Sequence, residues 1–226
     1  MTSALSQMFF FVLLLLGIYF FSRQTINELF YFLQIFFRKN ELVFSLISLI
    51  FLPGTIIHEL AHFLAAMILM LKVSEVRILP EIDKDNIRLG SVVYEKKDII
   101  RSILVGLAPI FLALSIFWIL ANFHVFPGPN IYFNALMVYV LFTISSTMFS
   151  SKKDLQDLIF VFPLIVIISA IVYIFDIRVD MVFRNKILME NIANIIKQVN
   201  YYLVVSLLIN IVLIVFFKSL RFVLKK

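Results

Sequence analysis

One long apolar stretch constrains this chain more than any other feature. Between residues 42 and 71 the only ionisable side chains are those of His58, Glu59 and His62. As one helix this stretch would extend ~45 Å at ~1.5 Å per residue, which is more than the ~30 Å hydrocarbon core of a bilayer requires. Charged groups in a membrane helix are costly and usually mark an ion, proton or substrate site. We therefore expect a membrane helix built around a functional centre.

A proline and a glycine lie in the middle of this stretch. Pro53 removes a backbone donor and disfavours helix in the residue before it, so we expect a break at Pro53 and Gly54. Thr55 is then the expected cap of a new helix. Small residues, Ala61, Ala65 and Ala66 among them, would let another helix approach closely.

The three ionisable residues form the pattern HExxH. At ~3.6 residues per turn, His58 and His62 lie on one face of a helix, where their imidazoles can bind one zinc ion. Glu59 is then close to the water that zinc activates, and it is the candidate general base. The alternative is a chance pattern, in which the histidines only hydrogen-bond to neighbouring helices.

The composition places the rest of the chain in the membrane. Hydrophobic residues make up 62% of the 226 residues, and the mean hydropathy is +1.04, values typical of an integral membrane protein. We expect a single all-α polytopic membrane domain over residues 1–226, and its zinc must be held by nitrogen and oxygen because the chain has no cysteine. About six transmembrane helices are expected, at residues 4–21, 42–71, 99–121, 131–149, 158–175 and 201–217.

Two polar segments lie between these spans. Residues 24–40 have a helical period with one polar face, which predicts a helix along the membrane interface, with a short extra span as the alternative. Residues 76–94 predict a small β-hairpin between the second and third spans. One edge of the hairpin could hold an extended substrate by strand addition, although a simple surface turn is equally compatible with the pattern.

The distribution of positive charge predicts the orientation. With the termini on one side, that side carries 13 of the 20 Lys and Arg residues, so we expect both termini and the hairpin to be cytoplasmic. The expected location is the cell membrane of a prokaryote. The net charge of +6 indicates orientation and contact with anionic lipid, and we expect no nucleic-acid partner.

Two histidines need a third protein ligand to form a catalytic zinc site. Asp154 is the preferred candidate because it lies in a short polar break between two spans, and Asp157 is the reserve. The pattern that begins at Ser151 also fits a capping box, in which Asp154 would only stabilise the start of a helix. His124 follows the third span on the predicted outer side, where an anchoring role is expected.

These features together resemble the site-2 protease family of intramembrane zinc metalloproteases and its membrane zincin relatives. The resemblance covers residues 49–158. It implies that His58, His62 and Asp154 bind zinc, that Glu59 is the base, and that the substrates are membrane-spanning proteins cut within or near the bilayer. The family pattern Asn-x-x-Pro-x-x-x-x-Asp-Gly is kept only at its aspartate, since Ser146, Phe149 and Leu155 occupy the other three positions.

Two rival functions remain open at this point. One is a membrane zincin with a glutamate as third ligand, for which Glu75, Glu81 and Glu95 are available. The other is a catalytically silent membrane scaffold or chaperone that keeps the fold. The preferred function is hydrolysis of peptide bonds in membrane-associated proteins by a zinc-activated water.

Overall fold

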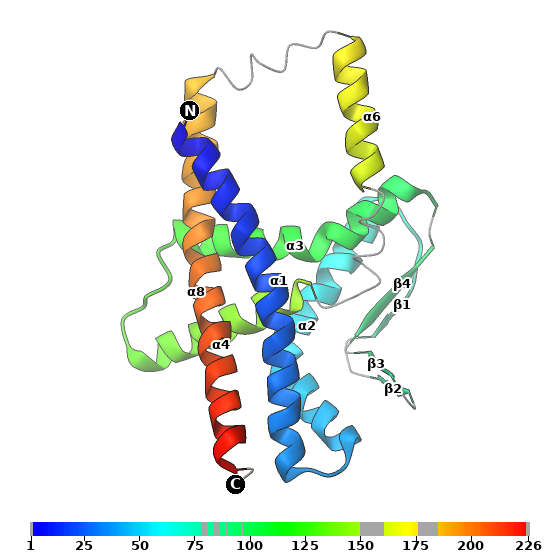
Figure 1. The fold of residues 1–226 in the computed structure, drawn as a ribbon. Helices are drawn as coiled ribbons and strands as arrows, with labels where there is room; N and C mark the ends of the chain where they lie inside the picture. Colours follow the sequence, from blue (N-terminus) through cyan, green and yellow to red (C-terminus); the bar gives the residue numbers. More distant parts are fainter. Residues whose placement is uncertain are drawn as a thin grey trace.

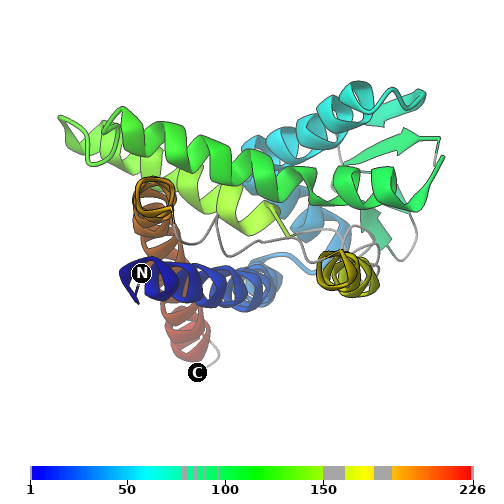
Figure 2. The same cartoon turned by 90° about the horizontal axis from the view of Figure 1, so that it is seen from above.

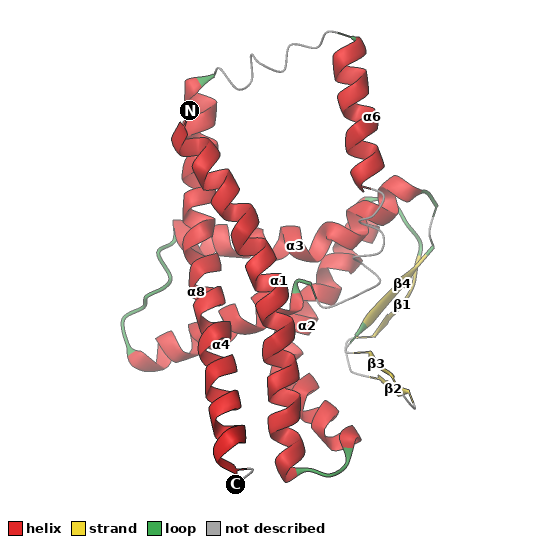
Figure 3. Ribbon diagram, viewed as in Figure 1, coloured by secondary structure: helices red, strands yellow, loops and turns green. Residues whose placement is uncertain are grey.

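The computed structural model describes residues 2–77, 81–83, 86–88, 90–95, 97–149, 161–175 and 185–224. These residues are predominantly helical, as predicted (Figure 3). In chain order the elements are α1 (Thr2–Phe36), α2 (Asn40–Ile68), β1 (Val73–Arg77), β2 (Glu81–Asp83), β3 (Asn86–Arg88), β4 (Ser91–Tyr94), α3 (Ile99–Asn122), α4 (Ile131–Thr147), α6 (Val161–Ile174) and α8 (Lys186–Leu224) (Figure 1).

Four helices of the described residues, rather than the expected six, are long and apolar enough to cross a membrane. They are α1, α2, α3 and α8. The helices at the other two predicted spans are shorter, with 17 residues in α4 and 14 in α6, whereas a spanning helix needs about 20. The long helices are compatible with an integral membrane protein.

The predicted interfacial helix over residues 24–40 is not a separate element. Helix α1 continues without a break from Thr2 to Phe36. The polar face of this stretch packs against protein: Thr25 Oγ1 donates to Asn210 Oδ1 of α8 at 2.8 Å. Because that face is satisfied by a neighbouring helix, the segment does not have to lie along the membrane surface.

Helices α1 and α8 run parallel along most of their length (Figure 1). In the N-terminal half of both helices, Asn200 Nδ2 donates to the carbonyl oxygen of Gln7 at 3.2 Å. Further along both, Arg221 Nη2 lies 2.9 Å from Glu28 Oε2. The first residues of α1 and the last residues of α8 therefore lie at opposite ends of the pair. The side of the membrane on which each terminus lies stays a prediction.

Helices α3 and α4 lie crosswise to the α1–α8 pair (Figures 1 and 2). The main core forms where these four helices meet. Its buried members are Leu14, Ile18, Ala113, Phe117, Leu141, Ile144, Met148, Val199, Tyr202 and Leu203. A smaller cluster, Leu29, Val43, Ile47, Phe51 and Phe142, joins α2 to α1 and α4. The smaller cluster holds α2 against α1 and α4.

Helix α2 passes through Pro53 without ending, so the predicted break is wrong. Thr55 is not a cap, because its Oγ1 donates to the carbonyl oxygen of Phe51 inside the same helix at 3.1 Å. Pro53 removes the helical donor to the Leu49 carbonyl. Tyr139 Oη of α4 donates to the next carbonyl, that of Ile50, at 2.8 Å, so a neighbouring helix contacts the backbone in this turn. Contacts from neighbouring helices are one reason why membrane helices tolerate proline.

Gly54 allows α2 and α4 to approach closely. A Cβ at this position would overlap the carbonyl oxygen of Thr143 and would lie 2.6 Å from Thr147 Oγ1. Only glycine leaves room for such a contact between helix backbones. The glycine is thus required by packing, not by a break in the helix.

The β-hairpin predicted between α2 and α3 is confirmed. Strands β1 and β4 are antiparallel, with Val76 opposite Val92, and β2 pairs with β3 further out, with Ile82 opposite Ile87. The hairpin follows the end of α2 directly and returns the chain to the start of α3. It therefore lies beside the helix that carries the HExxH pattern.

Candidate metal centre

The three residues of the HExxH pattern are buried on α2. The exposed fractions of His58, Glu59 and His62 are 4%, 6% and 6%. Two ionisable rings and a carboxyl group enclosed in this way need polar partners or a metal, because burying an isolated charge is costly.

The two imidazole rings converge through the same nitrogen atom. His58 Nε2 lies 3.1 Å from His62 Nε2. With zinc ~2.05 Å from each nitrogen, this spacing corresponds to an N–Zn–N angle of about 98°, close to the ~109° of tetrahedral coordination. The rings are nearly perpendicular, with an interplanar angle of 84°, and the two Nε2 atoms are within hydrogen-bond distance, so a metal ion would take the place of the proton they share. The pair thus fits a zinc ion in donor type and in spacing.

Helix α3 orients the second ring. His62 Nδ1 lies 2.9 Å from the carbonyl oxygen of Val105. A carbonyl can only accept, so Nδ1 carries the proton and donates it, and the lone pair of the neutral ring is then on Nε2. Metal-binding histidines commonly have such a second partner on the other ring nitrogen.

The hairpin covers the carboxylate of Glu59. A Cβ at Gly90 would lie 2.7 Å from Glu59 Cγ and 2.9 Å from Glu59 Oε1. The backbone just before β4 is therefore in close contact with this side chain, and a glycine makes the contact possible. The carboxylate is held between α2 and the hairpin, next to the histidine pair.

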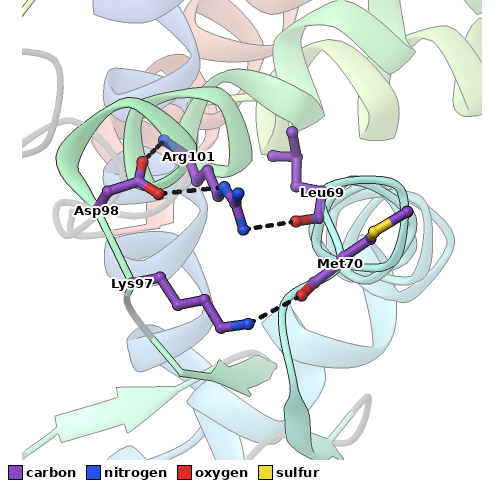
Figure 4. A network of polar contacts seen from close by, with 5 residues as sticks. All are labelled: Leu69, Met70, Lys97, Asp98 and Arg101. Carbon is purple, nitrogen blue, oxygen red and sulfur yellow. Dashed lines mark hydrogen bonds and ion pairs between the residues drawn. The ribbon is translucent and has the colours of Figure 1, made fainter.

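Cations from the start of α3 bind the last carbonyls of α2 (Figure 4). Arg101 Nη1 donates to the carbonyl oxygen of Leu69 at 3.2 Å, and Lys97 Nζ donates to that of Met70 at 3.4 Å. Asp98 caps α3, accepting from the Arg101 backbone N–H at 2.8 Å, and its other oxygen lies 3.1 Å from Arg101 Nε. Positive groups at a helix C-terminus are favourable, so this network fixes the end of the site helix to α3.

The end of α2 is a Schellman motif without glycine. Leu71 N–H donates to the Ala66 carbonyl at 2.9 Å, and Met70 N–H donates to that of Met67 at 3.0 Å. Met70 has a φ of 54°, the left-handed conformation that such a motif requires. Ala66, Leu71 and Val105 pack together below it, which positions the hairpin immediately after the site helix.

The residues that the structure describes contain no group of three His, Cys, Asp or Glu side chains able to share a metal. Asp154 and Asp157 lie outside those residues. Glu75 and Glu95 are exposed on the hairpin, and Glu81 lies in β2. His124 follows the far end of α3, about 28 Å along that helix from Val105 at ~1.5 Å per residue, so it is not part of this centre.

Sequence reasoning missed three contributors to this arrangement. The Val105 carbonyl and the close approach of Gly90 to Glu59 are main-chain features, and no sequence motif marks them. Gly54 had a visible signal, a glycine one helical turn before His58, but the sequence did not distinguish close packing from a helix break.

Comparison of the chain with known protein families, with curated proteins and with solved structures finds no match. A functional interpretation therefore depends on the chemistry of the residues themselves.

Proposed function

We propose that the chain is an intramembrane zinc metalloprotease that hydrolyses peptide bonds of membrane-associated proteins. One observation carries the proposal: two buried imidazoles with their Nε2 atoms 3.1 Å apart, next to a buried glutamate on the same apolar helix. This is the ligand pair and base of an HExxH hydrolase.

Each residue has a defined role in this proposal. His58 and His62 would hold the zinc, and a zinc ion bound there would lower the pKa of a bound water and polarise a substrate carbonyl. Glu59 accepts the proton of the attacking water and later donates it to the leaving amine. The Val105 carbonyl keeps His62 in the tautomer that leaves Nε2 available.

The path of the chain supports Asp154 as the third ligand. Helix α4 approaches α2 at Gly54, one helical turn before His58, and the described part of α4 and its following turn ends at Phe149. Five residues of extended chain span at most about 17 Å. A link of this length is compatible with Asp154 as the third ligand, and a His-His-carboxylate set is a common zinc site.

The apolar setting supports a membrane-spanning substrate. The site helix exposes a stripe of large apolar side chains away from the histidines, namely Ile56, Leu60, Leu64 and Met67. Such a surface is compatible with lipid or with another apolar helix. A water-soluble peptide would have to enter the lipid around this surface to reach the site, whereas a membrane-spanning protein already lies in the lipid.

The substitution Glu59→Gln tests the proposal. It keeps the size of the side chain but removes the base, so we expect zinc to stay bound and cleavage to fall by at least 100-fold. Glu41→Gln is the matched control, because Glu41 is exposed in the first turn of the same helix.

The measurement is cleavage of a single-span membrane reporter, tagged at both ends, in proteoliposomes with and without a zinc chelator. Zinc is measured on the same preparations by elemental analysis. A Glu59→Gln variant that cuts at the wild-type rate contradicts the assigned base. Wild-type protein with bound zinc and no cleavage of any membrane reporter favours the silent scaffold.

A further inference from the structure

A cleft of about 540 Å³ lies far from the candidate metal centre, between the end of α3 and the first part of α8. The turn after α3 forms one wall, which includes His124 and Phe126, and α8 forms the other. The proposed protease function does not use this cleft. The ligand that the cleft could bind can therefore be considered separately from the metal centre.

The α8 wall carries a row of hydrogen-bond donors. Asn194, Lys197, Gln198 and Tyr201 all line the cleft, and their spacing of three and four residues puts them on one face of the helix. The His124 imidazole belongs to the opposite wall. The described lining contains no Asp or Glu. A cleft with a lysine, a histidine and two amides, and without a carboxylate, favours an anion.

The basic side chains of the cleft are available to a ligand. In the part of the chain that the structure describes, no ion pair involves Lys197 or His124. By contrast, Lys186 at the start of the same helix lies 3.9 Å from Glu190. Lys197 thus carries a charge that no described carboxylate balances.

The floor of the cleft is fixed by the protein. Tyr202 is buried, and its Oη donates to the carbonyl oxygen of Leu120 at 3.0 Å. The α3 end is closed by a backbone hydrogen bond from Val125 N–H to the same carbonyl at 3.0 Å. His124 has a φ of 49° in this turn. These contacts hold the two walls at a set separation before any ligand binds.

The surroundings of the cleft are apolar and exposed. Phe123, which adjoins His124, is 77% exposed, and Tyr201, which lines the cleft, is 47% exposed. Tyrosine is enriched where protein meets the headgroup region of a bilayer. A ligand for this cleft therefore combines an anionic group with an apolar body.

We propose that this cleft binds the phosphate group of an anionic phospholipid. Lys197 supplies the opposing charge, Gln198 and Asn194 supply amide donors, and the acyl chains lie over the exposed aromatic side chains beside the cleft. Basic residues at a membrane surface are attracted to such lipids. The proposal does not depend on the metal centre, so each can fail without the other.

The single tryptophan of the chain gives a direct measurement. Trp118 lies on α3 one turn before Ala121, which lines the cleft. The protein is reconstituted in phosphatidylcholine vesicles, and phosphatidylglycerol with brominated acyl chains is added in small steps. We expect Trp118 fluorescence to be quenched in a saturable way at a low fraction of the brominated lipid.

Lys197→Gln is the decisive variant. Removing one basic group near a membrane surface costs about fivefold in affinity, so this variant needs about five times more brominated phosphatidylglycerol for the same quenching. Lys218→Gln is the matched control, because Lys218 is an exposed lysine near the other end of α8, and its curve should equal that of the wild type. Lys197 is exposed, so its replacement leaves the fold intact.

Two further arms separate the sources of the anion. Brominated phosphatidylcholine should quench weakly and without saturation, and millimolar inorganic phosphate should not reverse the quenching by phosphatidylglycerol. Equal curves for Lys197→Gln and wild type, or equal quenching by both lipids, would overturn the proposal. Reversal by inorganic phosphate would show a site for the free anion and would also overturn it.

Discussion

The α1–α8 pair and the α2–α3 region are held by different kinds of contact. Along α1 and α8, three polar contacts join two side chains: Thr25 with Asn210, Glu28 with Arg221, and Asn200 with Gln7. Contacts with the main chain, such as that from Asn200 to the Gln7 carbonyl, accompany them. Groups at the ends of side chains can adjust when a neighbour changes.

In the α2–α3 region, side chains meet the main chain. His62 donates to the Val105 carbonyl, and Arg101 donates to the Leu69 carbonyl. The backbone at Gly90 covers Glu59. The main chain cannot move aside as a side chain can, so these contacts fix the positions of the site residues.

The difference suggests where the chain is sensitive to change. Glycine-to-alanine substitutions test this difference directly, because glycines occur both near the site helix and in the α1–α8 pair. Substitutions of Gly90 and Gly54, near the site, should have large effects, whereas substitution of Gly17 in α1 should be tolerated.

Gly90→Ala should have the largest effect, and it should act on activity. The added Cβ would lie within 3.0 Å of three atoms of Glu59, so this carboxylate must shift. A misplacement of ~1 Å at a catalytic group can cost about 100-fold in rate. We expect a loss of that order in reporter cleavage, while zinc content and thermal unfolding stay near wild type. Wild-type cleavage by this variant would show that the contact does not position the base.

Gly54→Ala should act on stability. Its Cβ would overlap the Thr143 backbone, which cannot yield without separating α2 from α4. Overpacking of this kind costs about 1 to 3 kcal/mol, which is measurable by denaturant titration in mild detergent.

Gly17→Ala is the matched control in the α1–α8 pair, where the new Cβ would make only an ordinary contact, 3.4 Å from Leu207. Alanine is favoured over glycine in a helix by up to about 1 kcal/mol, so this variant should be as stable as wild type or more so. A loss equal to that of Gly54→Ala would remove the proposed difference between the two regions.

Thr25→Val should have the smallest destabilising effect. It removes the hydrogen bond to Asn210 Oδ1 but keeps the shape of the side chain. Hydrogen bonds between membrane helices average about 0.6 kcal/mol, and the free energy of unfolding should fall by that amount. A loss above about 2 kcal/mol would mean that the α1–α8 pair depends on this polar contact as strictly as the site region depends on its glycines.

The sequence predicted the features that arise from local pattern. The helical character of the long apolar runs, the hairpin after α2, and the shared face of His58 and His62 follow from periodicity and spacing. These features need no knowledge of neighbouring elements, and the described residues agree with them.

The errors arose where tertiary contacts override local preference. Pro53 remains in a helix whose neighbour donates to the Ile50 carbonyl. The polar face of α1 near Thr25 is covered by α8 rather than by the membrane interface. The parallel direction of α1 and α8 could not be inferred from charge counts, because the Lys and Arg distribution carries no information on which helices pack together. Asp154 stays a prediction, since it lies outside the described residues.

The zinc content of the purified protein is the most direct test of the central claim. Elemental analysis of the wild type, of His58→Ala and of Asp154→Ala should give about one zinc per chain for the first and background for the second. A strong reduction is expected for the third, because a catalytic site holds its metal through three protein ligands. Full zinc occupancy in His58→Ala, in protein that unfolds like the wild type, would contradict the account.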